Sequence, residues 1–168
     1  MAREYIVGPA AAATVNSITD AAQIFVNSSA TLANACALEY LRAWASQAGT
    51  ATSAQLAIAL RTQVTAFPTL TTATPRKTKL LDPISLIVGG IAGAAGTAGV
   101  LASVAGAGAK SEVIIDNFNV LNGWLWVPTP RETIIMPAMS ASGFGLYTPT
   151  IPATLTGWSF GLTYAELG

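Results

Sequence analysis

The sequence contains no histidine, a single cysteine and few charged residues. Without histidine, the most common general base and transition-metal ligand is missing, which excludes Ser-His-Asp and Cys-His catalysis. A single cysteine, Cys36, excludes an intrachain disulfide, and its apolar neighbours indicate a small buried side chain. The eight acidic residues are scattered singly, so no paired carboxylates for acid–base chemistry are evident. We therefore expect no enzymatic activity, no cofactor and no metal site.

Charged residues make up 10% of the chain, against about 25% in ordinary soluble domains. Eight basic and eight acidic side chains cancel, and Arg76, Lys77 and Lys79 form one short basic cluster. Because nucleic-acid binding depends on neutralising phosphates, we expect no nucleic-acid partner. A surface with so little charge has little self-repulsion, which favours a protein packed against neighbours. The amino-terminal residues lack the sustained apolar stretch of a secretion signal.

Alternation of apolar and polar residues predicts short β-strands along much of the chain. In the stretch 155–167, Trp158, Phe160 and Tyr164 share a bulky face that lies opposite a face of small residues. The runs 31–45 and 54–64, joined by a glycine-containing loop, predict a hairpin, although 31–45 also fits a helix. Further strands are predicted over 111–115, 133–136 and 143–147, with 14–26 as a strand or a loop.

The densest cluster of large side chains lies in residues 117–130. A predicted strand over 120–127 places Trp124 and Trp126 on one face, with Leu125 and Val127 on the other. The Pro-Thr-Pro sequence that follows ends the strand, because proline has no N–H to donate. We interpret this segment as an inner strand whose tryptophans anchor the core. If either tryptophan is exposed, it becomes the first candidate for a contact between subunits.

Residues 83–109 carry no charge and are rich in glycine and alanine. The length would suffice to span a bilayer, but most of these residues are only weakly apolar and no aromatic anchors flank them. We expect a long Gly/Ala-rich inserted loop over 83–110. A buried helix or packing arm and a membrane span are the alternatives.

Seven or eight short strands separated by turns rich in proline, glycine and threonine predict an all-β fold. The expected architecture is one domain over 1–168, an antiparallel β-sandwich of jelly-roll type. Residues 1–30 are expected to form an extended N-terminal arm or an edge strand.

Several segments, in this order, resemble small structural proteins of tailed bacteriophages. They are the opening MAREY, ALEYLRAWASQAGTATSAQLAIALRTQ, ATPRKTKLLDP, FNVLNGWLWVPTPRE and the closing alternation to YAEL. The proteins they resemble are capsid decoration (cement) proteins with β-sandwich or jelly-roll folds. In those relatives the segment after the TPR-type loop is polar and threonine-rich, whereas here residues 83–109 are longer and apolar.

This resemblance implies a virion protein on the capsid exterior that stabilises the shell. Its partners would be the major capsid protein and copies of itself, as a dimer or trimer. Arg76 and Lys77 beside Pro75 are candidate interface residues, as are Trp124, Trp126 and Trp158. The aromatic face that includes Trp158 could instead stack a sugar, so a ligand- or glycan-binding virion surface protein is the alternative function. A membrane-active protein using 83–109 is less favoured.

Overall fold

The computed structural model describes residues 2–28, 36–49, 53–90, 94, 96–138 and 142–168. These residues form strands, turns and connecting segments, with no helix among them. The strands build two sheets that pack face to face, so the predicted antiparallel β-sandwich is confirmed. The strands are β1 (Arg3–Val7), β2 (Ala21–Asn27), β3 (Ala37–Gln47), β4 (Gln55–Val64), β5 (Thr69–Thr72), β6 (Arg76–Lys77), β7 (Val88–Gly89), β8 (Thr97–Val104), β9 (Lys110–Asn119), β10 (Trp124–Trp126), β11 (Ile134–Met136), β12 (Ser142–Thr148) and β13 (Trp158–Leu167).

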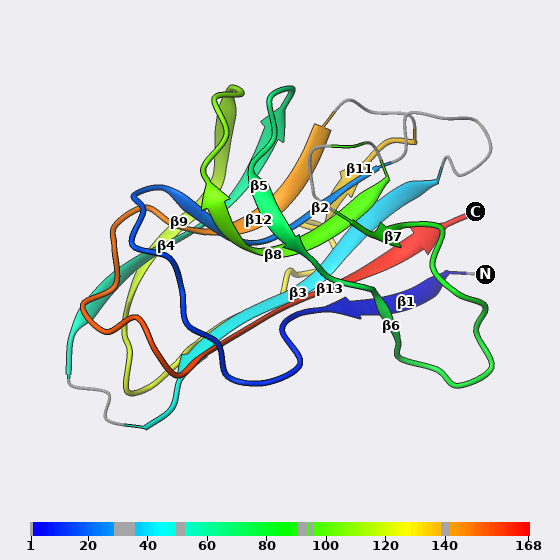
Figure 1. Ribbon diagram of the computed structural model, residues 1–168. Helices are drawn as coiled ribbons and strands as arrows, with labels where there is room; N and C mark the ends of the chain where they lie inside the picture. The colour runs from blue at the N-terminus through cyan, green and yellow to red at the C-terminus, as the bar shows by residue number, and fades with distance from the viewer. Residues whose placement is uncertain (1, 29–35, 50–52, 91–93, 95, 139–141) are drawn as a thin grey trace.

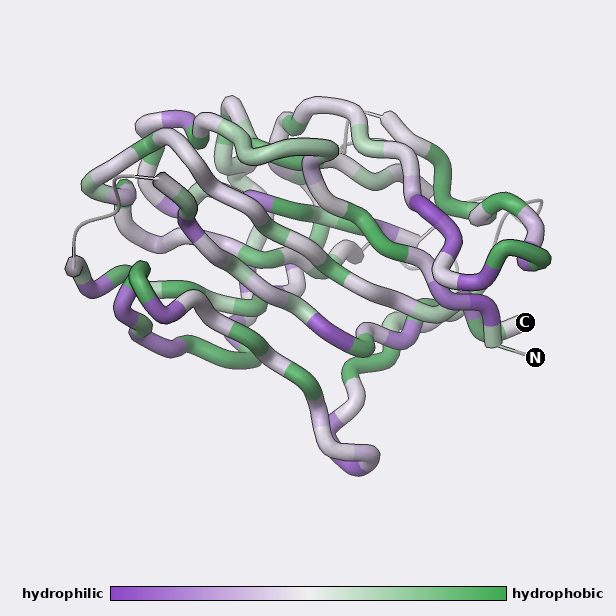
Figure 2. Tube along the Cα trace, turned by 90° about the horizontal axis from the view of Figure 1, so that it is seen from below, coloured by the Kyte–Doolittle hydropathy of each residue, from purple (hydrophilic) through white to green (hydrophobic). Residues whose placement is uncertain are grey.

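The two sheets differ in their number and order of strands. Sheet A has the strand order β10–β3–β13–β1–β6, with β11 also paired to β3. Sheet B has the order β5–β8–β2–β12–β4–β9, with β7 beside β8 in the one parallel pairing among the described strands. Figure 1 shows sheet A as the lower layer and sheet B as the upper layer. Figure 2 views the molecule from below, where hydrophobic residues alternate with more polar ones along the strands.

Strands near the N-terminus pair with strands near the C-terminus, and this pairing continues inward along the chain. Strand β1 pairs with β13, β2 with β12, β3 with β10 and β11, and β4 with β9. These pairs then roll up, so that β13 also pairs with β3 and β12 also pairs with β4. This arrangement of the principal antiparallel strands in two sheets is the topology of a jelly roll.

The main core lies between the two sheets, and β13 shows how the sequence builds it. Its alternation turns Trp158, Phe160 and Tyr164 inward, as predicted for the closing strand. From sheet B, Phe144 of β12 meets Tyr40 of β3 with ring centroids 4.3 Å apart. Aromatic side chains from both layers therefore supply much of the buried area that holds the sheets together.

A second, smaller core lies on the outer face of sheet B. It contains Phe25 of β2, Tyr147 of β12 and Leu70 of β5, with Phe67 from the β4–β5 turn packed against them. Strand β2 is consequently buried along its whole length. The centre of sheet B is thus covered on both faces.

The Gly/Ala-rich segment 83–110 contains a sheet strand, so its prediction as a loop was wrong for residues 97–104. Strand β8 lies between β5 and β2, and most of its side chains are buried. A Cβ atom on Gly99 would lie only 2.8 Å from the Cβ of Leu70, which explains why a small residue is needed. A strand covered on both faces shows no polar alternation, so its sequence does not reveal it.

The buried helix, one alternative for this segment, is not present in its described residues. Residues 91–93 and 95 lie outside the described part of the chain, and the rest of the segment forms strands, turns and bends. No helix among the described residues has the length and apolar character needed to cross a membrane.

Residues 1–30 were expected to form an extended arm or an edge strand, but they supply two strands that are neither. Strand β1 lies between β13 and β6, and β2 lies between β8 and β12, so both are interior strands. The inserted strands β5 to β8 account for this interior position. Strand β6 pairs with the edge of β1 that would otherwise be free, and β8 pairs with the corresponding edge of β2. An insertion between β4 and β9 therefore extends both sheets on the same side of the jelly roll.

The predicted hairpin of 31–45 with 54–64 was wrong, although both strands exist in the described residues. Strand β3 belongs to sheet A and β4 to sheet B, so their connection crosses between the layers. Residues 29–35 and 50–52 lie outside the described part of the chain. Within β3 the register shifts at Leu41, because Tyr164 pairs with Tyr40 whereas Thr163 pairs with Arg42. The shift turns Arg42 and Trp44 outward, onto the face opposite Tyr40.

The tryptophan-rich segment 117–130 connects the sheets rather than forming one inner strand. Residues 117–119 end β9 in sheet B, a turn closed by the Asn122 N–H to Asn119 carbonyl bond follows, and β10 then joins the edge of sheet A. The turn needs Gly123, whose φ of 69° lies in the left-handed region. The strand predicted over 120–127 shortens to Trp124–Trp126, and the strand predicted over 111–115 extends through residues 116–119 in β9.

Candidate functional site

The five candidate interface residues lie in three separate places. Arg76 and Lys77 form β6 at one edge of sheet A, and both are exposed. Trp124 and Trp126 form the ends of β10 at the opposite edge and are half-buried. Trp158 lies in β13, in the middle of the sheet. The structure therefore does not bring these residues together into one site.

Trp158 is a core residue. Only 1% of its surface is exposed, its ring stacks on Phe160 at 5.3 Å between centroids, and its Nε1–H donates to the Thr154 carbonyl at 2.7 Å. Tyr164, the third member of the predicted sugar-stacking face, is also buried. The described fold therefore offers no accessible stacking surface at these three residues, so the alternative in which they stack a sugar was wrong, as was the choice of Trp158 as an interface residue.

Trp124 and Trp126 close the open edge between the two sheets. Both pack against the main core, and Nε1–H of Trp124 donates to Oδ2 of Asp116 on β9 at 3.0 Å. Between them Leu125 points outward and is 58% exposed. The predicted two faces of this segment are therefore present on an edge strand, where the outward side chain meets solvent.

Apolar side chains are exposed along this edge of the sandwich. We call them the edge band, and they come from β9, β10, β11 and the turns beside them. Among the described residues, β9 pairs only with β4, and both β10 and β11 pair only with β3. Unpaired strand edges next to apolar side chains favour association with another protein chain. The edge band consists of Val113, Ile115, Leu121, Leu125, Val127 and Ile135.

A shallow groove of about 260 Å³ lies on the outer face of sheet A beside the edge band. Trp44 and Trp124 line it together with Arg42, whose guanidinium lies 5.0 Å above the Trp44 ring. The Trp44 indole lies over Gly161 of β13, where a Cβ atom would overlap the ring. Strict alternation along β3 would place Arg42 and Trp44 on the same face as Tyr40, so the sequence does not reveal this outward pair.

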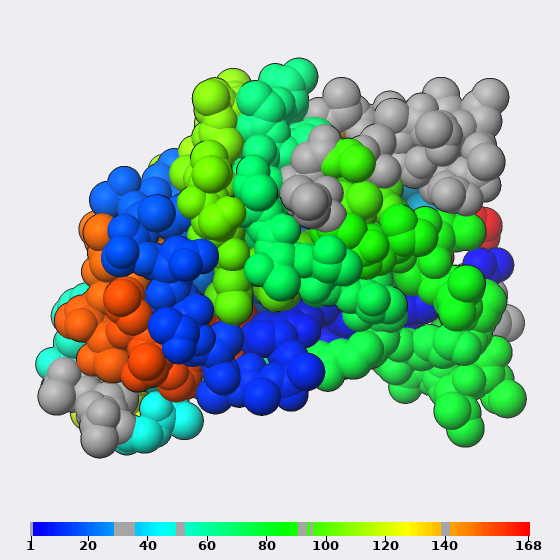
Figure 3. Space-filling view, in the orientation of Figure 1, coloured from blue at the N-terminus to red at the C-terminus, as the bar shows by residue number. Residues whose placement is uncertain are grey.

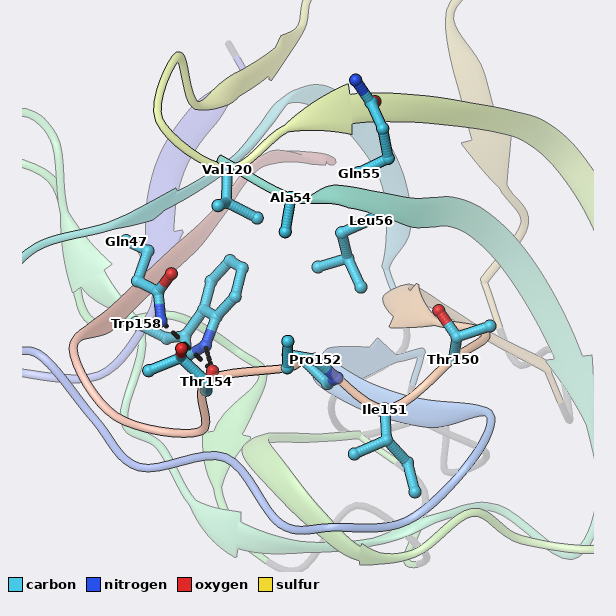
Figure 4. Close-up of a pocket in the computed structure, with 11 residues that line it drawn as sticks. Gln47, Ala54, Gln55, Leu56, Val120, Thr150, Ile151, Pro152, Thr154 and Trp158 are labelled. Carbon is cyan, nitrogen blue, oxygen red and sulfur yellow. Dashed lines mark hydrogen bonds between the residues drawn. The ribbon is translucent and has the colours of Figure 1, made fainter. Parts of the chain in front are cut away.

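Figure 4 shows a cavity of about 140 Å³ at one end of the sandwich, beside Trp158. Leu56, Val120 and Pro152 form much of its apolar wall. The amide of Gln47 already donates to the carbonyls of residues 154 and 156, at 3.1 and 2.9 Å. Ligand pockets usually measure about 300–1,000 Å³ and keep polar groups free for the ligand. This cavity is therefore a gap in the end of the core and a poor candidate for a ligand site.

The most exposed apolar residues lie at the other edge of sheet A, after β6. Leu80 and Leu81 are 92% and 96% exposed, and Ile84 is 80% exposed. We call residues 78–84 the leucine hook. The predicted basic cluster adjoins it, because Arg76, Lys77 and Lys79 precede the two leucines and are themselves exposed. Figure 3 shows this part of the chain, in bright green, as a projection at the lower right of the molecule.

A buried carboxylate lies directly behind the leucine hook. Glu166 of β13 is 3% exposed, and its Oε1 accepts bonds from the Ser85 hydroxyl at 2.5 Å and the Leu86 N–H at 2.7 Å. Ser85 also bonds the Tyr164 hydroxyl at 2.7 Å. The scattered spacing of the single acidic residues gave no indication in the sequence that one of them, Glu166, is buried. Only its position on the inward face of β13 could have identified it.

A network of charges holds the outer face of sheet B. Arg61 of β4 pairs with Asp20 and with Glu112 of β9, the latter at 2.7 Å, and Lys110 Nζ lies 2.5 Å from Asp20. Partial burial alone would raise the pKa of Asp20, but hydrogen bonds from Lys110 and Arg61 outweigh burial and lower it. These four groups pair with one another, so we assign them a structural role.

The described residues hold neither a cluster of metal-binding side chains nor an ionised thiol. No three His, Cys, Asp or Glu side chains among them gather closely enough to hold a metal ion. Cys36 is buried, and burial raises the pKa of its thiol to about 11, so it is protonated at neutral pH. Comparison with protein-family models, curated proteins and solved structures gives no match to this chain. The assignment of a function therefore rests on the exposed surfaces.

Proposed function

We propose that this chain is a structural virion protein of tailed bacteriophages, a capsid decoration (cement) protein. In this role it lies on the capsid exterior, binds the major capsid protein and stabilises the shell. One observation carries the proposal: apolar side chains are exposed at two opposite edges of the sandwich, on the leucine hook and in the edge band. A protein that holds neighbours together needs two contact surfaces, whereas a ligand-binding protein needs one concave site.

Two further features support this proposal. The low charge of the chain limits repulsion between copies that lie close together on a shell. The jelly roll also provides a rigid framework, because first and last strands pair within one sheet and fix the distance between the two contact edges. Modest affinity at each site is multiplied when many copies bind one shell.

The proposal is tested on purified virions of the phage whose genome encodes the chain. We expect the protein at a fixed ratio to the major capsid protein, measured by quantitative mass spectrometry. Capsids prepared without it should lose their DNA at a lower temperature or in low salt, and adding the purified protein should restore resistance. Capsids whose melting profile is the same with and without the protein would contradict the proposed role.

A glycan-binding virion surface protein is the second candidate, and the groove beside the edge band is the observation that favours it. Trp44, Trp124 and Arg42 line that groove, and Asn122 and Ser46 add polar groups at its border. An aromatic ring on an outer face, here that of Trp44, with adjacent polar groups suits a sugar, which has an apolar face and many hydroxyls. A glycan array probed with wild type and with Trp44→Ala tests this candidate. A signal that Trp44→Ala removes would support it, and the absence of any signal for wild type would reject it.

A further inference from the structure

The leucine hook places two large aliphatic side chains at the apex of a tight turn. The Asp82 N–H donates to the Lys79 carbonyl at 3.2 Å, so Leu80 and Leu81 occupy the two central positions of that turn. Side chains of this type are usually buried, and both are more than nine-tenths exposed here. Exposed apolar residues that adjoin one another and are bordered by polar groups are typical of contact sites for other molecules.

Both ends of the leucine hook are fixed to the sandwich. At the first end, the N–H and hydroxyl of Thr78 both donate to the Glu4 carbonyl of β1 at 3.1 Å. At the second end, the Tyr5 hydroxyl donates to the Pro83 carbonyl at 3.1 Å, and Glu166 holds the residues that follow. The turn is therefore formed before any partner binds, so binding does not have to order it.

Positive charge borders the two leucines. Arg76, Lys77 and Lys79 are exposed within five residues of them, against one acidic residue in the turn, Asp82. Nζ of Lys79 lies 3.9 Å from a carboxylate oxygen of Glu4. Complementary charge around an apolar contact guides association and fixes its orientation. The chemistry of the leucine hook thus fits an apolar socket that has carboxylates on its rim.

Four cavities among the described residues do not fit such a socket on a second copy of this chain. Their linings are without a single Asp or Glu, and three of them include an Arg or Lys. A bilayer is also a poor fit, because Asp82 follows Leu81 directly and would enter the apolar layer with it. These observations favour a different protein as the partner.

We propose that the leucine hook is the part of this chain that binds the major capsid protein. Leu80 and Leu81 enter an apolar socket on the capsid protein, and Lys77 and Lys79 pair with carboxylates at its rim. This inference rests on the proposed function, and it names the residues that make the shell contact.

Binding of the full-length chain to shells stripped of it tests this inference, by cosedimentation over a range of protein concentrations. We expect Leu80→Ser with Leu81→Ser to weaken binding by about 100-fold, since each buried leucine contributes roughly tenfold or more to affinity. Lys77→Glu with Lys79→Glu should weaken binding by about tenfold and reduce its dependence on salt. The matched control is Val64→Ser with Val104→Ser, which removes two exposed apolar side chains elsewhere and should change affinity less than threefold.

Each outcome separates this inference from the proposed function. Thermal unfolding should be unchanged in the leucine variant, because both side chains are exposed. If wild type and the leucine variant bind shells equally, the hook inference is overturned and the cement function stands. If wild type does not bind shells, both are rejected, and hook-dependent sedimentation with phosphatidylcholine–phosphatidylglycerol vesicles would then identify a membrane as the partner. Loss of self-association in the leucine variant, measured by light scattering, would instead assign the socket to a second copy.

Discussion

Three buried tyrosines contribute both to the packing of the core and to its hydrogen bonds. The hydroxyl of Tyr40 donates to the Val26 carbonyl, that of Tyr147 donates to Gln63, and that of Tyr164 bonds Ser85. Burial raises the pKa of all three tyrosine hydroxyls above the ordinary value of 10.0, so they are neutral hydrogen-bonding groups at neutral pH. Each ring therefore fills apolar space while its polar tip joins two strands or a strand and a loop.

Trp158 is predicted to be a stability residue rather than a contact residue. We expect Trp158→Ala to lower the free energy of unfolding by about 3–5 kcal/mol, because it removes a fully buried ring. Leu125→Ala, at an exposed position, should change it by less than about 0.5 kcal/mol. Urea denaturation of both variants measures the difference. A Trp158→Ala protein as stable as wild type would contradict the buried position of the ring.

Gly157 is predicted to tolerate no side chain. Its φ is +79°, and a Cβ atom there would overlap the carbonyl oxygen of Ala48. We expect Gly157→Ala to destabilise the protein by more than about 1 kcal/mol, since both strain and overlap act. Gly49→Ala is the control, because Gly49 has a φ of +94° with open space around its Cβ position. Thermal unfolding of the two variants should show the larger loss at Gly157.

At the scale of elements, ion pairs join Asp20, in the turn before β2, to Arg61 of β4 and Lys110 of β9. The lowered pKa of Asp20 means that its charged form is favoured in the folded state, relative to the ordinary value of 3.8. This contribution to stability is present above the ordinary pKa and is lost as the pH falls through the lower folded-state pKa. Acid should therefore weaken the attachment of the Asp20 turn to sheet B.

We expect Asp20→Asn to be less stable than wild type at pH 7 and nearly equal to it near pH 2. Asparagine suits this position because Asp20 has a φ of 58°, a left-handed conformation that Asn tolerates well. Urea midpoints measured between pH 7 and pH 2 give the comparison. A stability difference that stays constant over this range would show that the Asp20 charge does not contribute.

Strands in which large apolar side chains alternate with small or polar ones were predictable from the sequence. Strand β13 alternates cleanly because one face of it meets the main core, and β4 was predicted for the same reason. Strand β8 escaped prediction because both of its faces are covered and its residues are small. In β3, one extra residue at Leu41 moves Arg42 and Trp44 to the outer face of the sheet. No local sequence pattern predicts such a register shift.

The candidate contact surfaces were only partly predictable. The basic residues Arg76 and Lys77 were singled out because they lie in a proline-containing loop, and they do adjoin the leucine hook. The exposure of Leu80 and Leu81 was not predicted, since apolar residues in a loop segment are usually buried beneath it. Their position depends on Glu166, which is distant in sequence. Its carboxylate accepts hydrogen bonds from Ser85 and Leu86, the residues that follow the leucine hook.

At the scale of the whole molecule, the edge band is expected to carry contacts between copies of the chain. Light scattering should give a mass that is a multiple of the chain mass, because unpaired edges of both sheets adjoin exposed apolar residues there. Ile115→Lys should shift this mass toward that of a single chain. Leu81→Ser, at the opposite edge of the molecule, is the control and should leave the mass unchanged. A monomeric wild type at all concentrations would reject this use of the edge band.

Pairing of the chain from both ends inward has a consequence for how the protein is made. Strand β13 lies between β1 and β3, so sheet A lacks its central strand until residues 158–167 have left the ribosome. Nearly all sheet contacts join residues far apart in sequence, a property that slows folding. During synthesis, β1 and β3 would hold unpaired edges for most of translation. We expect folding to begin only after synthesis of β13, and to need protection from aggregation until then.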